Sequence, residues 1–386
     1  MNFLRLRNRF FLFAAAVLAL GSCAYLTKGF SVAWQGGDSD LRIREAEWAD
    51  FKQGIYPNRR FTPEGKTPAK THTVYPPYAL PMYAVFFGPG GFLTARVILQ
   101  ALSIGGLMAM VWQGYRTLGT AGWQAGWLGA VLGAAISGNC TAIALGQFSI
   151  ICAGFLSLQV LAMQANRGVL AGICWAMAMI KPQIALPFAL LFVLQRQWRG
   201  LFSGAALLAV LSAAAFWWTG WSPWDFFHQS LATEKLLFIR NTGFSGTGWM
   251  EWIDLPPRAA VAIAFAFIAT AGVAVLLYDW RSKVSLLNGA GLCAMLGFLL
   301  FYHRQYDNQM LFLLMLAAAA RVLQNGWRLL DMIVCGLLGL TLYVPAGMVA
   351  ESGSLSFLAF VAPVAAAVLI LLPTRRAAEI VPPVQA

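Results

Sequence analysis

Charge is scarce in this 386-residue chain, where 11% of the residues are charged and only fifteen are acidic. With 59% hydrophobic residues and a mean hydropathy of +0.67, the composition excludes an ordinary soluble globular protein. Repeated apolar runs of bilayer-crossing length predict a polytopic membrane protein instead. The net charge of +12 does not indicate a nucleic-acid partner, because thirteen basic residues lie in short inter-helix turns or at the chain ends. That placement is typical of cytoplasmic membrane anchors.

Residues that bind metals are also scarce. The three histidines, His72, His228 and His303, lack HxxxH or HxxH spacing, and the six cysteines form no C-x-x-C pair. Every cysteine lies within or at the end of an apolar run, so we expect small buried residues there. The sequence therefore predicts no metal site and no cofactor.

The apolar runs predict an all-α protein with one transmembrane domain over residues 1–386 and about 10–12 transmembrane helices. The expected spans are 10–34, 91–115, 121–138, 147–165, 168–180, 184–195, 201–219, 258–278, 285–302, 308–322, 329–346 and 355–373. Two of them, 168–180 and 184–195, are short and broken by Pro182 and Pro187, which favours a helical hairpin that turns inside the protein. Leu20-Gly21-Ser22-Cys23 resembles a lipoprotein signal, but the long apolar run around it favours an uncleaved first span.

The positive-inside rule places the amino terminus in the cytoplasm. Two long segments then lie outside: 35–90, the first outer loop with an interfacial helix and a re-entrant piece, and 220–256, the second. The two long outer loops hold ten of the fifteen acidic residues, and all three histidines lie outside as well. We therefore expect the chemistry on the outer side of the inner (plasma) membrane.

The first outer loop offers the best-placed carboxylates. Residues 40–53 carry Leu41, Trp48 and Phe51 on one helical stripe, which predicts an amphipathic helix on the outer membrane surface. Asp40 at its amino end is either a helix cap or a general base held at the edge of a membrane cavity. Asp38 is the second candidate for the base, because it also follows directly on the first span.

Cationic and aromatic residues elsewhere provide candidate ligand contacts. Lys181, set among apolar residues, is either a functional cation or one that snorkels to the headgroups. His303 and Arg304 enter a span from outside, where a cation can meet a lipid phosphate, although Arg304 can also neutralise Asp307 at i, i+3. The Tyr75–Tyr78 stretch can stack on a sugar or anchor at the headgroups. The candidate substrate-binding residues are Arg44, Tyr75, Tyr78, Gln147 and Asp307.

Several short motifs occur in a recognisable order. They are Asp40-Leu41, Gly54-Ile55-Tyr56-Pro57, Tyr75-Pro76-Pro77-Tyr78 with Leu80-Pro81, Leu145-Gly146-Gln147, Arg167-Gly168, Ile180-Lys181-Pro182 and Arg196-Gln197-Trp198-Arg199. In this order and spacing the chain resembles glycosyltransferase family 87, membrane transferases of the GT-C architecture that use polyprenyl-phosphate sugars. The resemblance covers most of the chain.

The resemblance implies that a hexose or pentose, typically mannose, moves from a polyprenyl monophosphate to a hydroxyl of a glycan or glycolipid acceptor. It matches the catalytic base to Asp40, with Asp38 second, and a late histidine to His303, although the His-Arg-Gln-Tyr-Asp stretch departs from the commoner pattern. Lys181, Arg304 or His303 would then bind the donor phosphate, with inversion at the sugar and without a metal. Membrane lipids are the remaining partner.

An alternative from another class is a secondary transporter or lipid flippase. Such a protein would also be polytopic and could also carry an intramembrane lysine. The sequence shows no internal inverted repeat, and its acid-bearing loop directly after the first span has no later counterpart. Both features favour the enzyme.

Overall fold

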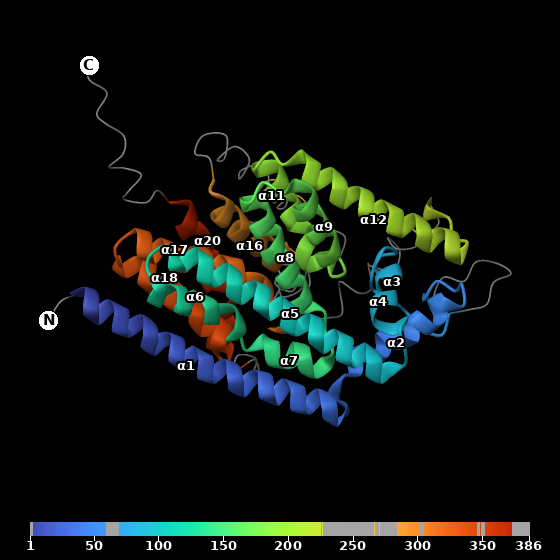
Figure 1. Cartoon of the computed structure of the whole chain (residues 1–386), viewed down its shortest axis with the longest axis horizontal. Helices are drawn as coiled ribbons and strands as arrows, with labels where there is room; N and C mark the ends of the chain where they lie inside the picture. Colours follow the sequence, from blue (N-terminus) through green and yellow to red (C-terminus); the bar gives the residue numbers. More distant parts are fainter. Residues whose placement is uncertain are drawn as a thin grey trace, which may run out of the picture.

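A computed structural model describes residues 3–58, 69–224, 284–300, 305–345 and 352–372, and the single positions 226, 266, 270 and 348 (Figure 1). Within these ranges the chain is helical and contains no strand, only an isolated antiparallel bridge between Asn58 and His72. The predicted all-α class is therefore confirmed.

The helices follow one another with short connections. In the first part they are α1 (Phe3–Val32), the π-helical turn η1 (Ala33–Gly37), α2 (Ser39–Lys52), α3 (Ala79–Met82), α4 (Ala84–Phe87), α5 (Phe92–Gly119), α6 (Trp123–Ala134), α7 (Gly138–Leu145) and α8 (Ser149–Gln164). Then come α9 (Gly168–Ala178), α10 (Pro182–Ala185), the 3-10 turn η2 (Leu186–Phe188), α11 (Ala189–Leu194) and α12 (Trp198–Thr219). The last described elements are α16 (Leu286–Leu300), the 3-10 helix η3 (Gln305–Leu311), α17 (Phe312–Gln324), α18 (Leu329–Tyr343) and α20 (Gly353–Leu371).

Three helices of the described chain are long and apolar enough to cross a membrane: Arg7–Gly37, Phe92–Gly119 and Trp198–Thr219. A fourth span results if α6 and α7, which meet at 44°, are counted together. Six further apolar helices have 10–17 residues. The described residues thus hold fewer full-length spans than the predicted 10–12, because several apolar runs are broken into shorter helices. The predicted span 258–278 lies outside the described residues except for two single positions. The segment 139–146, which lies between the expected spans 121–138 and 147–165, is not a turn but forms most of α7.

The predicted break around Lys181 is present. Helix α9 ends at Ala178, and Lys181 directly precedes α10, whose first residue is Pro182. A proline is well accommodated there, because its missing N–H has no partner to lose in a first helical turn. Pro187 then lies in η2 and separates α10 from α11. The chain therefore reverses at Lys181 within the folded protein.

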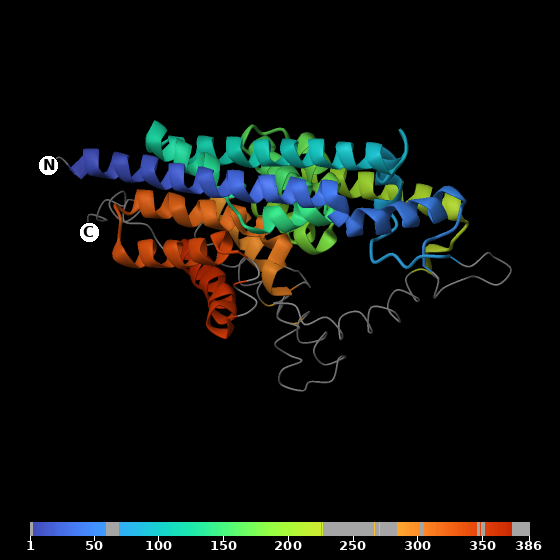
Figure 2. The same ribbon diagram turned by 90° about the horizontal axis from the view of Figure 1, so that it is seen from below.

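Close helix packing holds the bundle together. A Cβ atom added to Gly114 of α5 would lie 2.0 Å from the carbonyl oxygen of Gly129 in α6, so only glycine allows this approach. Such contacts are typical of membrane helices, where packing replaces the hydrophobic driving force. Helices α1 and α5 run along the long axis of the molecule in both views (Figure 1, Figure 2).

The polar helix α2 lies at one end of the bundle together with two short apolar helices. Helices α2, α3 and α4 gather at the end farthest from the N-terminus, beside the last turns of α12 (Figure 1). Trp218 at the end of α12 donates a hydrogen bond of 2.7 Å to the backbone carbonyl of Phe51 at the end of α2. Most of the predicted second outer loop, 220–256, and its four acidic residues lie outside the described residues.

Candidate functional site

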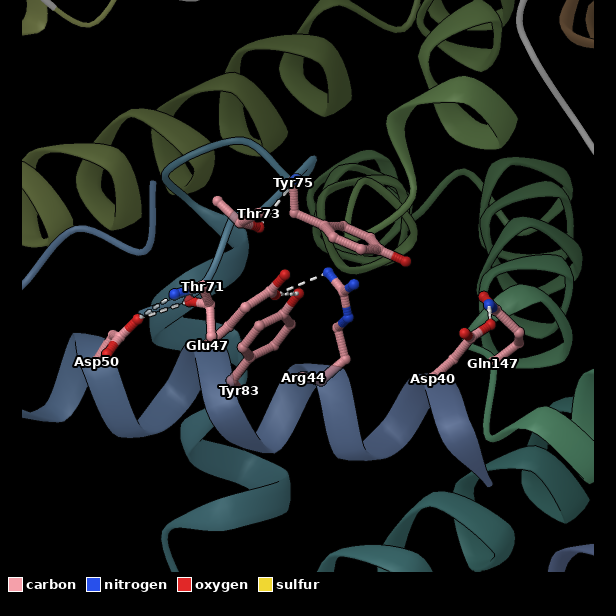
Figure 3. Close-up of polar contacts among 9 residues, drawn as sticks. All are labelled: Asp40, Arg44, Glu47, Asp50, Thr71, Thr73, Tyr75, Tyr83 and Gln147. Atoms are coloured by element: carbon pink, nitrogen blue, oxygen red, sulfur yellow. Dashed lines mark hydrogen bonds and ion pairs between the residues drawn. The ribbon is translucent and has the colours of Figure 1, made fainter. Parts of the chain in front are cut away.

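The first helix ends in a turn that redirects the chain into α2. Gly36 adopts a φ of 95°, a conformation that favours glycine, and α2 starts at Ser39. Asp38 occupies the cap position without a side-chain cap bond, and Asp40 lies inside the first turn. The cap interpretation of Asp40 is therefore wrong. Its carboxylate instead accepts a hydrogen bond from the side-chain amide of Gln147 (Figure 3).

A glycine brings these two residues together. Gly146, which ends α7, has a φ of 74°, and a Cβ atom there would lie 2.7 Å from the Cβ atom of Leu41. The end of α7 can therefore lie directly against the start of α2. Gln147 follows at once and is buried, whereas Asp40 is partly exposed. In the motif Leu145-Gly146-Gln147, the glycine therefore allows the close approach to α2 and the glutamine contacts Asp40.

Asp38 has a different environment. It is 1% exposed and accepts a hydrogen bond of 2.5 Å from the guanidinium Nε of Arg96 in α5. Arg42 contributes a longer ion pair of 3.9 Å. The guanidinium of Arg96 also lies over the rings of Trp34 and Phe92, at 5.3 and 5.1 Å. Asp38 is therefore half of a buried ion pair that ties the start of α2 to α5.

Helix α2 presents a polar stripe to the protein interior. Asp40, Arg44 and Glu47, spaced i, i+4 and i+7, rise from one side of the helix (Figure 3). The expected helix is present over Ser39–Lys52, and Leu41 and Phe51 are buried as the apolar stripe requires. However, Glu47 and Asp50 are buried as well, so its inner side is more polar than that of a helix that lies only on lipid.

Arg44 and Glu47 form the centre of this stripe. Nη1 of Arg44 donates to Oε2 of Glu47 at 2.7 Å, and the hydroxyl of Tyr83 donates to the same oxygen at 3.3 Å. The guanidinium of Arg44 lies over the ring of Tyr75, 4.6 Å from its centroid. Glu47 is fully buried, and burial raises its pKa to about 7 against the opposing effect of Arg44 and the hydroxyls of Thr73 and Tyr83.

Asp50 holds the segment that carries Tyr75. Its Oδ2 accepts hydrogen bonds from the backbone amides of Lys70 and Thr71, both at 3.0 Å, and from the hydroxyl of Thr71 at 2.6 Å. Three donors on one oxygen of a buried carboxylate indicate a structural role. It fixes the return of the loop over α2 and thereby the position of Tyr75 (Figure 3).

A second polar group forms around Lys181. Its Nζ lies 2.5 Å from Oδ1 of Asp307 and 2.8 Å from the hydroxyl of Ser149, which itself donates to Asp307 at 2.5 Å. Lys181 is 2% exposed, so the snorkelling interpretation is wrong. Its partner is Asp307, in η3, with which it pairs across 126 residues of sequence. The ammonium also lies 5.1 Å from the centroid of the Tyr306 ring.

Three consecutive residues join the two groups. Gln147 contacts Asp40, and Ser149 belongs to the Lys181 group. Phe148 between them stacks on Tyr83 at 5.9 Å and meets Tyr75 edge-on at 6.3 Å. The start of α8 therefore links the Asp40 contact, the aromatic cluster and the Lys181 group through three consecutive residues.

The predicted residues are brought together only in part. Asp40 and Arg44 belong to the α2 stripe, and Gln147 and Tyr75 contact it. Lys181 and Asp307 adjoin these residues through the start of α8. Tyr78 stands before α3, partly buried against the hydrophobic core. His303 and Arg304 lie outside the described residues. In the residues that the structure covers, no group of three or more His, Cys, Asp or Glu side chains could hold a metal.

Sequence reasoning missed three members of the site. They are Glu47, Tyr83 and Ser149. A signal for Glu47 was available, because Asp40, Arg44 and Glu47 share the spacing of one helix face. Tyr83 and Ser149 sit in apolar surroundings, and only their three-dimensional contacts distinguish them from core residues.

Fold and site together define a helical membrane protein with a polar centre at one end of its bundle. A family model described as glycosyltransferase family 87 matches residues 73–302, more than half of the 386-residue chain. The chain belongs to glycosyltransferase family 87 and is therefore a membrane glycosyltransferase, with a sugar donor and an acceptor as substrates. Neither a search of curated proteins nor one of solved structures found a match. The matched segment begins after α2, so the stripe residues precede it.

Proposed function

We propose that this glycosyltransferase moves a hexose or pentose, mannose foremost, from a polyprenyl monophosphate to an acceptor hydroxyl at the outer face of the membrane. We further propose that the protein has a GT-C architecture and that transfer is a single in-line displacement, which inverts the configuration at the anomeric carbon. The carboxylate of Asp40 takes the proton of the acceptor hydroxyl, and the hydroxyl oxygen attacks the anomeric carbon. The bond from that carbon to the phosphate oxygen breaks, and polyprenyl monophosphate leaves with the bonding electron pair.

The observation that carries this proposal is the state of Asp40. It is partly exposed, and its hydrogen-bond partner among the described residues is a neutral amide, that of Gln147, which donates to Oδ2. A carboxylate that is oriented by an amide but not neutralised by a cation can still accept a proton. Asp38, two residues earlier, is buried against Arg96 and is poorly placed for this task.

Cations near Asp40 support a phosphate leaving group. Arg44 lies one helical turn further along α2, on the same side as Asp40 (Figure 3). Lys181 is held by Asp307, close to the start of η3, and His303 and Arg304 directly precede η3 in sequence. We propose that the Lys181–Asp307 pair fixes this segment so that its cations, with Lys181, stabilise the charge on the departing phosphate.

The outer-face assignment rests on α1. This helix begins near the basic residues Arg7 and Arg9 and ends at the turn into α2, at the opposite end of the bundle. If Arg7 and Arg9 anchor the cytoplasmic side, a crossing α1 carries Asp40 to the outer side. Exposed tryptophans at that end, Trp34, Trp217 and Trp218, fit the headgroup level.

The test is transfer by purified protein from synthetic polyprenyl-monophosphate sugars, with nucleotide sugars as the matched donor control and a panel of acceptors. We expect product only with the lipid-linked donors, inverted at the anomeric carbon, and none above background with Asp40→Asn. Transfer from a nucleotide sugar, or a retained configuration, would refute the proposed donor or mechanism. Family membership favours this enzyme over the transporter or flippase alternative, which predicts donor movement across proteoliposomes without donor consumption.

A further inference from the structure

The Arg44–Glu47 pair points to a residue that neither the family match nor the sequence analysis assigns. Building on the proposed function, we propose that Glu47 is a positioning residue for donor binding: with Tyr83 it holds the guanidinium of Arg44 against Tyr75, where this cation binds the donor phosphate.

Arg44 is the better-placed of the two cations in the described site. A guanidinium has five N–H donors, and the contact with Glu47 at 2.7 Å uses Nη1. The ring of Tyr75 covers one face of the guanidinium and leaves its edge for a planar, bidentate contact with phosphate. The Arg44 side chain is 11% exposed, whereas Lys181 is 2% exposed and neutralised by Asp307 at 2.5 Å.

The spacing along α2 matches the reaction. Residues four apart on a helix have Cβ atoms about 5–6 Å apart, and Asp40 and Arg44 point to the same side (Figure 3). In an in-line displacement the acceptor hydroxyl and the leaving phosphate lie on opposite faces of one carbon. A base and a cation one helical turn apart can therefore contact the acceptor hydroxyl and the donor phosphate, respectively, in the same complex.

Glu47 holds Arg44 more firmly than an exposed ion-pair partner would. It is completely buried, and the hydrogen bonds from Arg44 and Tyr83 both end on its Oε2. An arginine without this anchor would lose its fixed orientation, because the long side chain would regain the rotamer freedom that the contact removes. Tyr83, also fully buried, supplies the second hydrogen bond that fixes the carboxylate.

Competition between Glu47 and the donor phosphate for Arg44 should make donor binding depend on pH. Phosphate and the Glu47 carboxylate compete for one cation, so a bound donor favours the protonated form of Glu47. Because burial places the pKa of Glu47 at about 7, the free enzyme changes its protonation near neutrality. The charged and titratable groups that face Glu47 are Arg44, Asp50, Tyr56, Tyr75 and Tyr83. Burial raises the pKa of each of these tyrosines, so Glu47 is the group that titrates near pH 7.

The sign follows directly. Below the pKa, neutral Glu47 leaves the full charge of Arg44 to the phosphate, and above it the ionised carboxylate weakens donor binding. A rise of one unit in this pKa on donor binding makes the donor KM about tenfold higher well above pH 7 than well below it. Glu47→Gln keeps the shape and an acceptor oxygen but cannot ionise, so its donor KM stays low across that range.

The experiment measures donor KM, acceptor KM and kcat between about pH 6 and pH 9 for wild type, Glu47→Gln and Arg44→Gln. Glu45→Gln is the matched control, because Glu45 lies on the same helix outside the site. Binding of a short-chain polyprenyl monophosphate, with inorganic phosphate in a parallel arm, gives a readout that needs no catalysis. We expect Glu47→Gln to flatten the pH dependence, Arg44→Gln to weaken binding of the lipid phosphate about tenfold or more, and Glu45→Gln to match wild type.

Equal pH profiles and equal lipid-phosphate affinity for Glu47→Gln and wild type would overturn the inference. So would an effect of Glu47→Gln on the unfolding temperature alone. These failures differ from failure of the proposed function, which shows as full transfer by Asp40→Asn or as no transfer from any polyprenyl-phosphate sugar. The binding arm decides the role of Arg44 and Glu47 in either case.

Discussion

Asp38 and Asp40 are two residues apart, yet the fold gives them opposite environments. Asp38 is 1% exposed and lies 2.5 Å from the guanidinium of Arg96. Asp40 is partly exposed and meets the amide of Gln147. A paired, buried carboxylate contributes to structure, because removing its partner leaves an uncompensated charge. A carboxylate oriented by a neutral group remains available for proton transfer. Position in sequence does not separate the two residues, whereas their partners do.

The largest stability effect is expected on the Asp38 side of this comparison. Arg96→Met keeps an unbranched apolar stem but removes the guanidinium and leaves Asp38 as an unpaired buried charge, which costs about 3–5 kcal/mol of folding free energy. Unfolding by denaturant in detergent measures the loss. The double variant Arg96→Met with Asp38→Asn should recover part of it, because no stranded charge remains. Wild-type stability of Arg96→Met would mean that the pair is unimportant.

Gly146 lies close to the segment that carries both carboxylates. A Cβ atom at this position would also lie 3.5 Å from the Cβ of Asp38. Gly146→Ala combines a positive φ with a 2.7 Å approach to Leu41, so we expect about 1–3 kcal/mol of destabilisation and a lower kcat. Gly326→Ala is the control, because Gly326 has a similar φ of 66° and no atom within 4 Å. It should lose stability but not kcat. Equal kcat values for the two variants would argue against a role of the α7–α2 contact in catalysis.

The smallest effect is expected at the amide that orients Asp40. Gln147→Ala removes one hydrogen bond, worth about 1 kcal/mol, so kcat should fall roughly fivefold to tenfold. Steady-state kinetics should show little change in donor KM, since Gln147 contacts the base rather than the cation. A rise in KM with unchanged kcat would instead support the earlier substrate-binding role of Gln147.

The sequence predicted the class of the fold and the position of its polar region. Low charge and long apolar runs sufficed for an all-helical membrane protein, and Pro182 marked the break after Lys181. The number of full-length spans was not predictable, because hydropathy does not show where an apolar run bends. The 44° angle between α6 and α7 is an example, since together the two helices are long and apolar enough for one span.

The candidate site was predictable as a list of residues but not as a network. Asp40, Arg44, Tyr75 and Gln147 could be named from local patterns. Their partners depend on contacts between segments far apart in sequence, such as Gln147 with Asp40, 107 residues away. The same holds for Asp307, which pairs with Lys181 across 126 residues of sequence. Its local candidate partner, Arg304, lies outside the described residues. Only the folded chain decides which carboxylate a cation neutralises.

The most direct measurement compares kcat for Asp38→Asn and Asp40→Asn, each normalised to the amount of folded protein, with one polyprenyl-monophosphate sugar as donor. We predict that Asp40→Asn loses about 10²- to 10⁴-fold in kcat, because its amide cannot take the acceptor proton, at nearly wild-type stability. Asp38→Asn should lose stability and keep kcat within a few-fold of wild type. The reverse ranking, with kcat lost at Asp38 and kept at Asp40, would contradict the assignment of Asp40 as the base.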